Sequence, residues 1–151
     1  MISVEFTNRQ PQPIDPQPLI AAVQRVLQSE GIKAAEISLA IVSDAEIHEV
    51  NRRFLQHDQP TDVISFVLEH SDTTLVGEIV ASYETARREA IGYAWEPAAE
   101  LLLYVIHGAL HLAGYDDRNA TDRRIMRSRE RHYLALFQLE PRYDTEDADG
   151  E

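Results

Sequence analysis

The stretch HGALHLAGYDD, residues 107–117, decides how the rest of this sequence is interpreted. His107 and His111 are four residues apart, so on a helix they share one face and can present two imidazoles to one metal ion. Gly114 favours a left-handed end to that helix, and the returning chain brings the acids at 116–117 toward the same place. Three protein ligands and one open coordination position are typical of a catalytic rather than a structural zinc site.

Two other interpretations of this stretch are possible. Two histidines on an apolar helix are also compatible with core residues that hydrogen-bond to backbone, but a glycine turn followed at once by two acids favours a metal site. A zinc-protease helix carries Glu directly after the first His as the general base. That position is Gly108 here, which disfavours a metalloprotease-like hydrolase.

The stretch resembles the hallmark of the YbeY family of metal-dependent endoribonucleases and rRNA maturation factors, H-G-x-L-H-L-x-G-Y-D-H. A second block, NRRFLQHDQPTDVISF at residues 51–66, is similar to the family segment N-x-x-[FY]-R-x-x-D-x-P-T-D-V-L-S-F. Two departures are visible: Asp117 stands where the third His is expected, and Leu55 stands where the family has Arg. The resemblance implies one metal-dependent endoribonuclease domain over residues 1–140. Residues 141–151 fall outside it, and their acidic composition predicts a disordered tail.

The resemblance also implies substrate, partners and cofactor. The substrate would be single-stranded RNA, notably the 3′ end of 16S rRNA, in rRNA processing and ribosome quality control. The partners would be small-subunit rRNA and the ribosome, with ribosomal proteins and an assembly GTPase as further candidates. The cofactor would be one divalent ion, Zn²⁺ first, with Mn²⁺ or another transition metal as alternatives. A non-catalytic ribosome-assembly factor with a structural metal is the alternative function.

The residues expected to hold the metal are His107, His111 and Asp117, and those expected to act in catalysis are the same three with Asp116 and Arg52. Asp116 is a candidate general base, although it could equally be a turn residue. Arginine is suited to gripping phosphate bidentately, and Arg52 shares a helical face with position 55, where the family arginine is missing. Thr61 and Asp62 resemble family positions beside the site, but are also ordinary turn chemistry.

Composition sets the class of protein. The 151 residues carry 44% hydrophobic residues, enough for one domain with a real core. The absence of cysteine excludes disulfides and thiolate ligands, so any metal must use His, Asp or Glu. No secretory signal pattern opens the chain, and the longest apolar run, Leu101–Ile106, is too short to cross a membrane. We therefore expect a soluble cytoplasmic protein with no membrane partner.

The charge is uneven along the chain. The net charge is −12, and the segment 140–151 alone contributes −5. The segment 118–131 instead holds six arginines against two acids. It is either an RNA-facing surface or a solvated helix face.

Hydrophobic periodicity predicts an α+β domain, a small mixed four-stranded sheet packed with about five helices, with the metal-binding helix at the centre. Strands are expected at residues 1–7, 37–41, 61–68 and 75–81, the first two parallel and the last two antiparallel. Helices are expected from Asp15 to Gly31, from the Ser43–Glu46 capping box through Phe54, at 82–91 with Gly92 as the stop, at 97–111, and from Asn119 or Thr121 onward. Gly108 inside the 97–111 helix suggests a close approach by a neighbouring strand.

Overall fold

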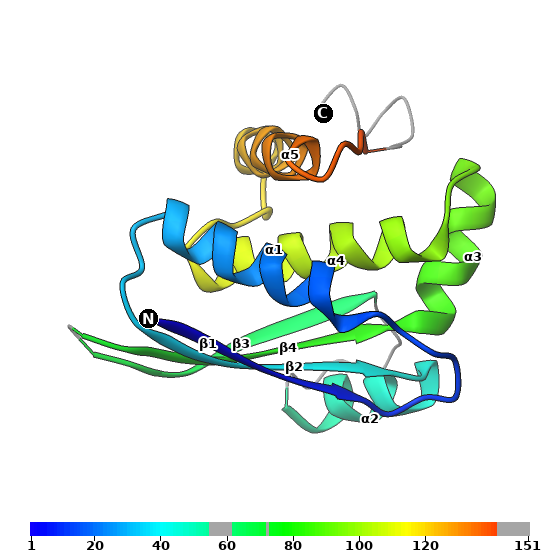
Figure 1. Ribbon diagram of the computed structural model, residues 1–151, viewed down its shortest axis with the longest axis horizontal. Helices are drawn as coiled ribbons and strands as arrows, with labels where there is room; N and C mark the ends of the chain where they lie inside the picture. The colour runs from blue at the N-terminus through cyan, green and yellow to red at the C-terminus, as the bar shows by residue number, and fades with distance from the viewer. Residues whose placement is uncertain (55–61, 72, 142–151) are drawn as a thin grey trace.

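The structure is a computed structural model that describes residues 1–54, 62–71 and 73–141 (Figure 1). Along the chain its elements are β1 (Ile2–Asn8), α1 (Pro16–Ser29), β2 (Ala35–Val42), α2 (Asp44–Phe54), β3 (Val63–His70), β4 (Leu75–Ser82), α3 (Tyr83–Tyr93), α4 (Pro97–Leu112) and α5 (Ala120–Ala135). The predicted α+β class, with four strands and five helices in this part of the chain, is confirmed. Asp58-Gln59-Pro60 predicts a turn, but these residues lie outside the described part of the chain, as do Leu55, Thr61 and the tail from 142.

The four strands form one mixed sheet in the order β1-β2-β4-β3. Strand β2 runs parallel to both β1 and β4, whereas β3 runs antiparallel to β4. Both predicted pairings are therefore confirmed. In β2 the side chains of Ile37, Leu39 and Ile41 point into the core, and exposed Glu36 and Ser38 lie between them.

The helices form layers around the sheet (Figure 1). Helices α1 and α4 cover one face, and α5 lies over them on the side away from the strands. Helix α2 packs on the opposite face of the sheet, and α3 stands at one end. Helix α4 touches α1, α3, α5, β3 and β4, and residues 101–106 within it are all buried. The helix with the histidine pair is thus the central helix, as predicted.

The helix N-termini follow the capping signals in the sequence. The Asp15 carboxylate and the Asn119 side-chain oxygen each accept a hydrogen bond from a backbone N–H in the first turn of α1 and α5. Ser43 Oγ likewise accepts from the backbone N–H of Glu46 at 3.2 Å. The Glu46 carboxylate accepts from Arg9 Nη1 at 2.8 Å, so only one arm of the predicted capping box is seen.

Two predicted ends differ from the structure. Helix α3 continues through Gly92, and Ala94 adopts the left-handed conformation with φ 58°. The Trp95 N–H then bonds to Ala90 O, so the tertiary anchoring of Trp95 sets this end. Strand β3 extends to His70, beyond the predicted end at Leu68, because its pairing with β4 continues past a bulge.

The apolar residues of this part of the sequence predict Ile125 and Leu136 on the inner face of the last helix. Ile125 is instead 47% exposed, and Leu136, directly after the end of α5, is 45% exposed. Helix α5 is an outer layer, so only a narrow stripe of it is buried. That stripe comprises Met126, Glu130, Tyr133 and Leu134.

Gly108 lets α4 lie close to the sheet. A Cβ at this position would lie 2.9 Å from Ile79 Cγ2 on β4 and 3.4 Å from Val63 Cγ2 on β3. The expected close approach by a neighbouring strand is therefore found, and it involves two strands. It fixes the depth at which His107 and His111 stand relative to the sheet. Within the described segments, no helix has the length and apolar character needed to span a membrane.

Candidate metal centre

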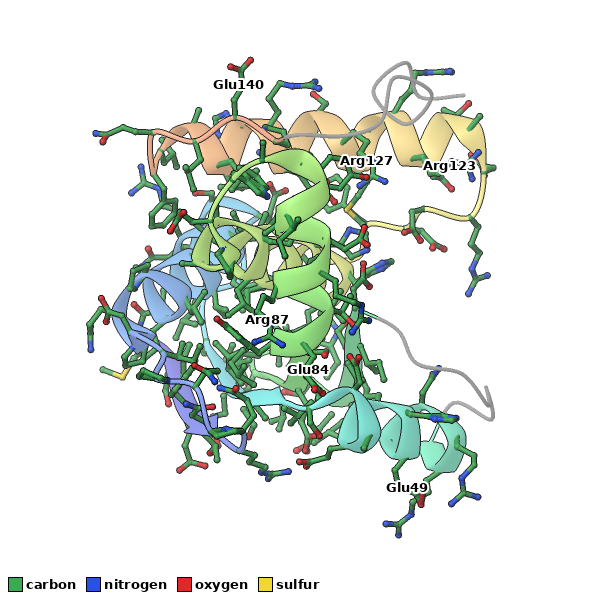
Figure 2. All side chains as sticks on the ribbon, turned by 90° about the vertical axis from the view of Figure 1, so that its right-hand side faces the viewer. Glu49, Glu84, Arg87, Arg123, Arg127 and Glu140 are labelled. Carbon is green, nitrogen blue, oxygen red and sulfur yellow. The ribbon has the colours of Figure 1, made fainter. Side chains whose placement is uncertain are left out.

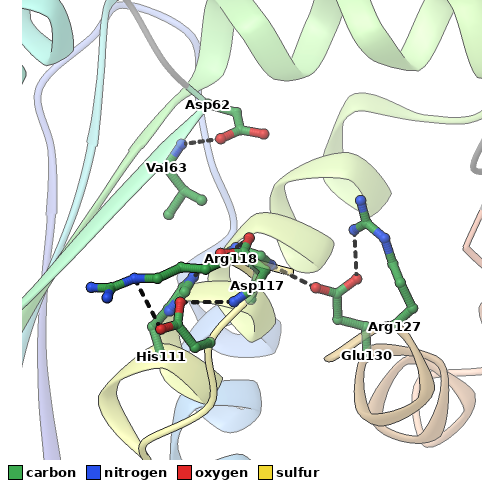
Figure 3. A network of polar contacts seen from close by, with 9 residues as sticks. Asp62, Val63, His111, Asp117, Arg118, Arg127 and Glu130 are labelled. Atoms are coloured by element: carbon green, nitrogen blue, oxygen red, sulfur yellow. Dashed lines mark hydrogen bonds and ion pairs between the residues drawn. The ribbon is translucent and has the colours of Figure 1, made fainter. Parts of the chain in front are cut away.

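Three side chains converge at the C-terminal end of α4. His107 and His111 project from its last turns, and Asp117 comes from the loop that leads to α5. His107 Nε2 lies 3.1 Å from His111 Nε2 and 3.4 Å from Asp117 Oδ2. His111 Nε2 lies 3.6 Å from Asp117 Oδ1. Figure 3 shows His111 and Asp117 in this cluster.

These separations fit a single ion. Zinc–nitrogen and zinc–oxygen bonds of about 2.0–2.2 Å in a tetrahedron place neighbouring ligand atoms about 3.3 Å apart. The two Nε2 atoms are 3.1 Å apart, and each lies 3.4 or 3.6 Å from its nearer Asp117 oxygen, Oδ2 for His107 and Oδ1 for His111. One ligand atom from each residue can be chosen so that all three lie within 4.8 Å of one another. His107, His111 and Asp117 can therefore hold one divalent cation, and among the described residues they are the one group of this kind found.

The loop that carries Asp117 returns through the predicted glycine turn. Gly114 has φ 110°, a conformation that glycine adopts without a Cβ clash. Its N–H bonds to His111 O at 3.0 Å, and the N–H of Tyr115 bonds to Leu110 O at 3.0 Å. These bonds satisfy carbonyls at the end of α4 and turn the chain back toward the histidines.

A partly buried polar cluster around Glu30 holds this loop from the other side. Its carboxylate accepts hydrogen bonds from Tyr115 Oη at 2.8 Å, Tyr133 Oη at 2.5 Å and Arg129 Nη2 at 2.8 Å. Burial raises the pKa of Glu30, but these donors outweigh burial and hold it below its ordinary value. Glu30 therefore ties the end of α1 to α5 and to the loop two residues before Asp117.

Sequence reasoning missed Glu130, which is fully buried on α5. Its Oε2 lies 2.6 Å from His107 Nδ1, and its Oε1 accepts from Arg127 Nη1 at 3.1 Å (Figure 3). A carboxylate on the far nitrogen of a metal-binding histidine fixes the ring and its tautomer. The available signal was position: Glu130 lies four residues after Met126 and three before Tyr133, on the inward stripe of the helix.

The charges in this cluster shift the pKa values of its members. Burial lowers the pKa of His107, but Asp117 and Glu130 more than compensate and raise it to about 10. Burial and the neighbouring His107 charge lower the pKa of His111. The hydrogen bond from His107 lowers the pKa of Asp117 to about 2. The acids thus stabilise positive charge at this point of the fold, whether a proton or a metal supplies it.

The other two predicted catalytic residues are not members of this three-residue cluster. Asp116 Oδ1 accepts from the backbone N–H of Asp117 at 2.8 Å, and its Oδ2 lies 3.1 Å from Arg118 Nε. Arg52 lies on α2, across the sheet from α4, and its guanidinium donates to the carboxylate of Glu49. Figure 2 shows Glu49 on α2 at the opposite side of the molecule from Arg127 on α5.

A cavity of about 270 Å³ adjoins the cluster, and both His107 and Asp117 line it. Its walls come from α4, α3, α5 and the start of β3, where Asp62 stands. Asp62, expected beside the site, is therefore at the cavity wall. Its Oδ1 accepts from the N–H of Val63 at 2.7 Å, which is also the turn role that the sequence suggested (Figure 3).

Fold and site together define a small α+β domain that carries a candidate His–His–Asp metal centre on its central helix. The sequence model described as endoribonuclease YbeY matches residues 5–138. The chain belongs to the YbeY endoribonuclease family.

Individual relatives agree with this assignment. Endoribonuclease YbeY of Syntrophotalea carbinolica is 38% identical over 148 residues, covering 93% of this chain and 97% of the relative. That of Rhodopirellula baltica is 45% identical over 113 residues, covering 74% of this chain but only 58% of the relative. The solution structure of a Thermotoga maritima protein, 25% identical, superposes with a TM-score of 0.62 over 98% of this chain and 99% of that one.

Proposed function

We propose that this protein is a metal-dependent endoribonuclease that cuts single-stranded RNA in rRNA processing, with the 3′ end of 16S rRNA as substrate and ribosome quality control as its setting. The observation that carries the proposal is the meeting of His107, His111 and Asp117 at separations that suit one ion, in a chain of the endoribonuclease YbeY family. Small-subunit rRNA, the ribosome, ribosomal proteins and an assembly GTPase are the proposed partners, and the cytoplasm the proposed location.

In this proposal His107, His111 and Asp117 hold one divalent ion, with Zn²⁺ as the first candidate. A bound ion supplies Lewis acidity toward a phosphoryl oxygen and lowers the pKa of water. Glu130 accepts the Nδ1–H of His107 and so directs Nε2 toward the ion. The Asp117 carboxylate brings the site formally to +1, where three neutral imidazoles would leave +2, and an oxygen ligand makes Mn²⁺ a stronger competitor.

The cation that contacts the scissile phosphate has two candidates. Arg52 remains the candidate from the sequence, but its guanidinium is engaged by Glu49 on the far side of the sheet. Arg127 lines the cavity beside the metal ligands and is held by Glu130. Its charge also lowers the pKa of Asp117, which supports its nearness to the site. We therefore favour Arg127 over Arg52. Asp116 stays a candidate base, although its described contacts lie within its own loop and with Arg118.

A non-catalytic assembly factor with a structural metal is the second candidate function. The layered core supports the enzyme over this alternative, because α4 is packed by α1, α3 and two strands independently of the ligands. We therefore expect the domain to keep its fold when an ion is removed. Gly108, in the place of the protease general base, still argues against a metalloprotease-like hydrolase.

The test combines metal content with RNA cleavage. His107→Ala with His111→Ala should lose the bound ion and cleavage of single-stranded RNA, while the circular dichroism spectrum stays folded. His132→Ala, an exposed histidine on α5, is the matched control and should keep both. Unchanged metal content in the double variant contradicts the site, and unfolding on metal removal favours the structural alternative.

A second arm of the same experiment compares Arg127→Gln with Arg52→Gln. Loss of a phosphate contact should lower RNA affinity and reduce its dependence on salt. We expect this for Arg127→Gln alone; the reverse result would return the role to Arg52.

A further inference from the structure

A polar stripe runs along α4, which is otherwise apolar. Glu100, Tyr104, His107 and His111 are spaced by four, three and four residues, so they share one face of the helix. His107 and His111 belong to the metal cluster. Glu100 and Tyr104 have no part in it, although each is only 4% exposed. Two buried polar side chains on the central helix therefore need a separate explanation.

The cavity of about 270 Å³ explains where they lie. It is lined by Asp62, Val63, Glu89, Tyr93, Glu100, Leu103, Tyr104, His107, Asp117, Arg127 and Glu130. Glu100 and Tyr104 form part of its α4 wall, and the metal ligands His107 and Asp117 form another part. A group bound in this cavity would consequently lie beside the ion and beside the phosphate that the ion contacts.

The chemistry of the lining selects the kind of group. Away from Arg127 and the metal ligands, the charged side chains of the lining are the carboxylates of Asp62, Glu89 and Glu100, so this part of the cavity repels a phosphate. Carboxylates accept hydrogen bonds, which favours a neutral group rich in N–H donors. The rings of Tyr93 and Tyr104 and the apolar side chains of Val63 and Leu103 suit a flat partner. Unstacked RNA bases are bound in proteins by this combination of aromatic contact and hydrogen bonds to their edges.

Tyr104 adds an independent observation. Its hydroxyl is buried, and the described part of the chain offers it no hydrogen bond of good geometry. Its polar neighbour is the Glu100 carboxylate, and burial together with this carboxylate raises the pKa of the Tyr104 hydroxyl. Buried hydroxyls nearly always have a well-formed hydrogen bond, so this group is suited to meeting a ligand. One turn away, Glu100 Oε1 accepts from Trp95 Nε1 at 2.7 Å. Burial raises the pKa of Glu100 despite that bond and the nearby Tyr104 hydroxyl, and a further donor would stabilise the carboxylate.

We infer that this cavity binds one nucleobase of the RNA substrate, adjacent to the scissile phosphate, and that it prefers guanine. Guanine is the base with two neighbouring N–H donors, N1–H and the N2 amino group, which one carboxylate can accept together. Adenine and cytosine offer one amino donor next to an acceptor nitrogen, and uracil offers one donor between two acceptors. The inference rests on the proposed ribonuclease function and adds a base preference to it.

The chain contains its own reporter, because Trp95 is the only tryptophan and bonds directly to Glu100. The metal-loaded protein is titrated with GMP, AMP, CMP and UMP, and Trp95 fluorescence and calorimetry report binding. All four share one phosphate, so its attraction to the ion cancels in the comparison. GMP should bind about tenfold tighter than the others, as expected for one bidentate base contact.

Two conservative variants test the residues. Glu100→Gln removes an acceptor charge but keeps an oxygen for Trp95, and Tyr104→Phe removes only the hydroxyl. Each should reduce the preference for GMP and leave the metal content unchanged. Glu96→Gln, an exposed residue outside the cavity, is the charge-matched control and should keep the preference. If Glu100→Gln fails to fold, Tyr104→Phe and the wild-type titrations still decide.

Equal affinity of the wild type for the four nucleotides overturns the inference, as does a preference that survives in every folded variant. Cleavage of single-stranded RNA, mapped in parallel, separates this failure from failure of the proposed function. RNA cleavage together with equal nucleotide affinities would support the ribonuclease function and contradict the base site. A preference for GMP without RNA cleavage would support the base site and contradict the ribonuclease function.

Discussion

At the scale of single residues, Glu130 joins two parts of the site. Its carboxylate contacts His107 on one oxygen and Arg127 on the other, and it is wholly buried. A buried carboxylate needs such partners, because an unpaired charge in the interior is costly. The same carboxylate therefore positions a candidate metal ligand and the cation that we favour for phosphate.

Glu130→Gln should weaken metal binding by about 10–100-fold, because the amide holds the His107 ring less firmly and polarises it less. Chelator competition with Zn²⁺ and the visible spectrum of the Co²⁺-loaded protein measure this. Glu140→Gln, exposed beyond the end of α5, is the control and should bind metal as the wild type does. Equal metal affinity in both variants would show that Glu130 has only a packing role.

At the scale of elements, the close packing of α4 on the sheet depends on the absence of a Cβ atom at Gly108. Ile79 is fully buried and stands where a Cβ on residue 108 would come within 2.9 Å. Helix propensity alone favours alanine over glycine by about 1 kcal/mol. Overpacking a core costs about 1–3 kcal/mol, and here α4 would have to lift from β4 to relieve the clash.

Gly108→Ala should therefore lower the free energy of unfolding by about 1 kcal/mol, and it should also disturb metal binding through His107 and His111. Gly92→Ala is the matched control, because it is also helical but its Cβ would meet nothing within 4 Å. That substitution should stabilise by about 0.5–1 kcal/mol. Urea unfolding measures the change in the free energy of unfolding for both variants, which should be opposite in sign. A stabilised Gly108→Ala variant would contradict the close packing of α4 against β4.

At the scale of the whole molecule, Glu30 connects segments that are far apart in the chain. Its donors Tyr115, Arg129 and Tyr133 come 85, 99 and 103 residues later. The pKa of Glu30 is held below its ordinary value of 4.5 in the folded protein. Its contribution to stability is therefore fully present above pH 4.5 and is lost as the pH falls through the lower, folded-state value.

Glu30→Gln should lower the free energy of unfolding by about 1.5 kcal/mol or more at pH 7. The difference from the wild type should shrink as the pH falls from 4.5 through the lower, folded-state pKa of Glu30, because Glu30 is then protonated and both side chains are neutral. Denaturant unfolding across this pH range checks the sign. Glu36→Gln, exposed on β2, is the control and should stay within about 0.5 kcal/mol of the wild type throughout. If Glu30→Gln lowered the free energy of unfolding equally at every pH, packing and not the charge of Glu30 would stabilise the cluster.

Much of this arrangement was determined by the sequence alone, wherever the cause is local. Strand alternation, capping residues and a glycine stop act within a few residues, so β2, the start of α1 and the turn at Gly114 could be predicted. The convergence of His107, His111 and Asp117 could also be predicted from local sequence, because only one helical turn and one tight turn separate the three residues.

The tertiary structure alone decided what distant segments bring to one another. Glu130 reaches His107 because α5 folds over α4, and Glu30 reaches Tyr115 because α1 packs beside both. Arg52 lies across the sheet from the site because α2 packs on the opposite face. A periodic pattern shows that a helix has a buried face, but not which face of the sheet covers it. That choice depends on the connections and on close packing, as at Gly108 against Ile79, and these exist only in the folded chain.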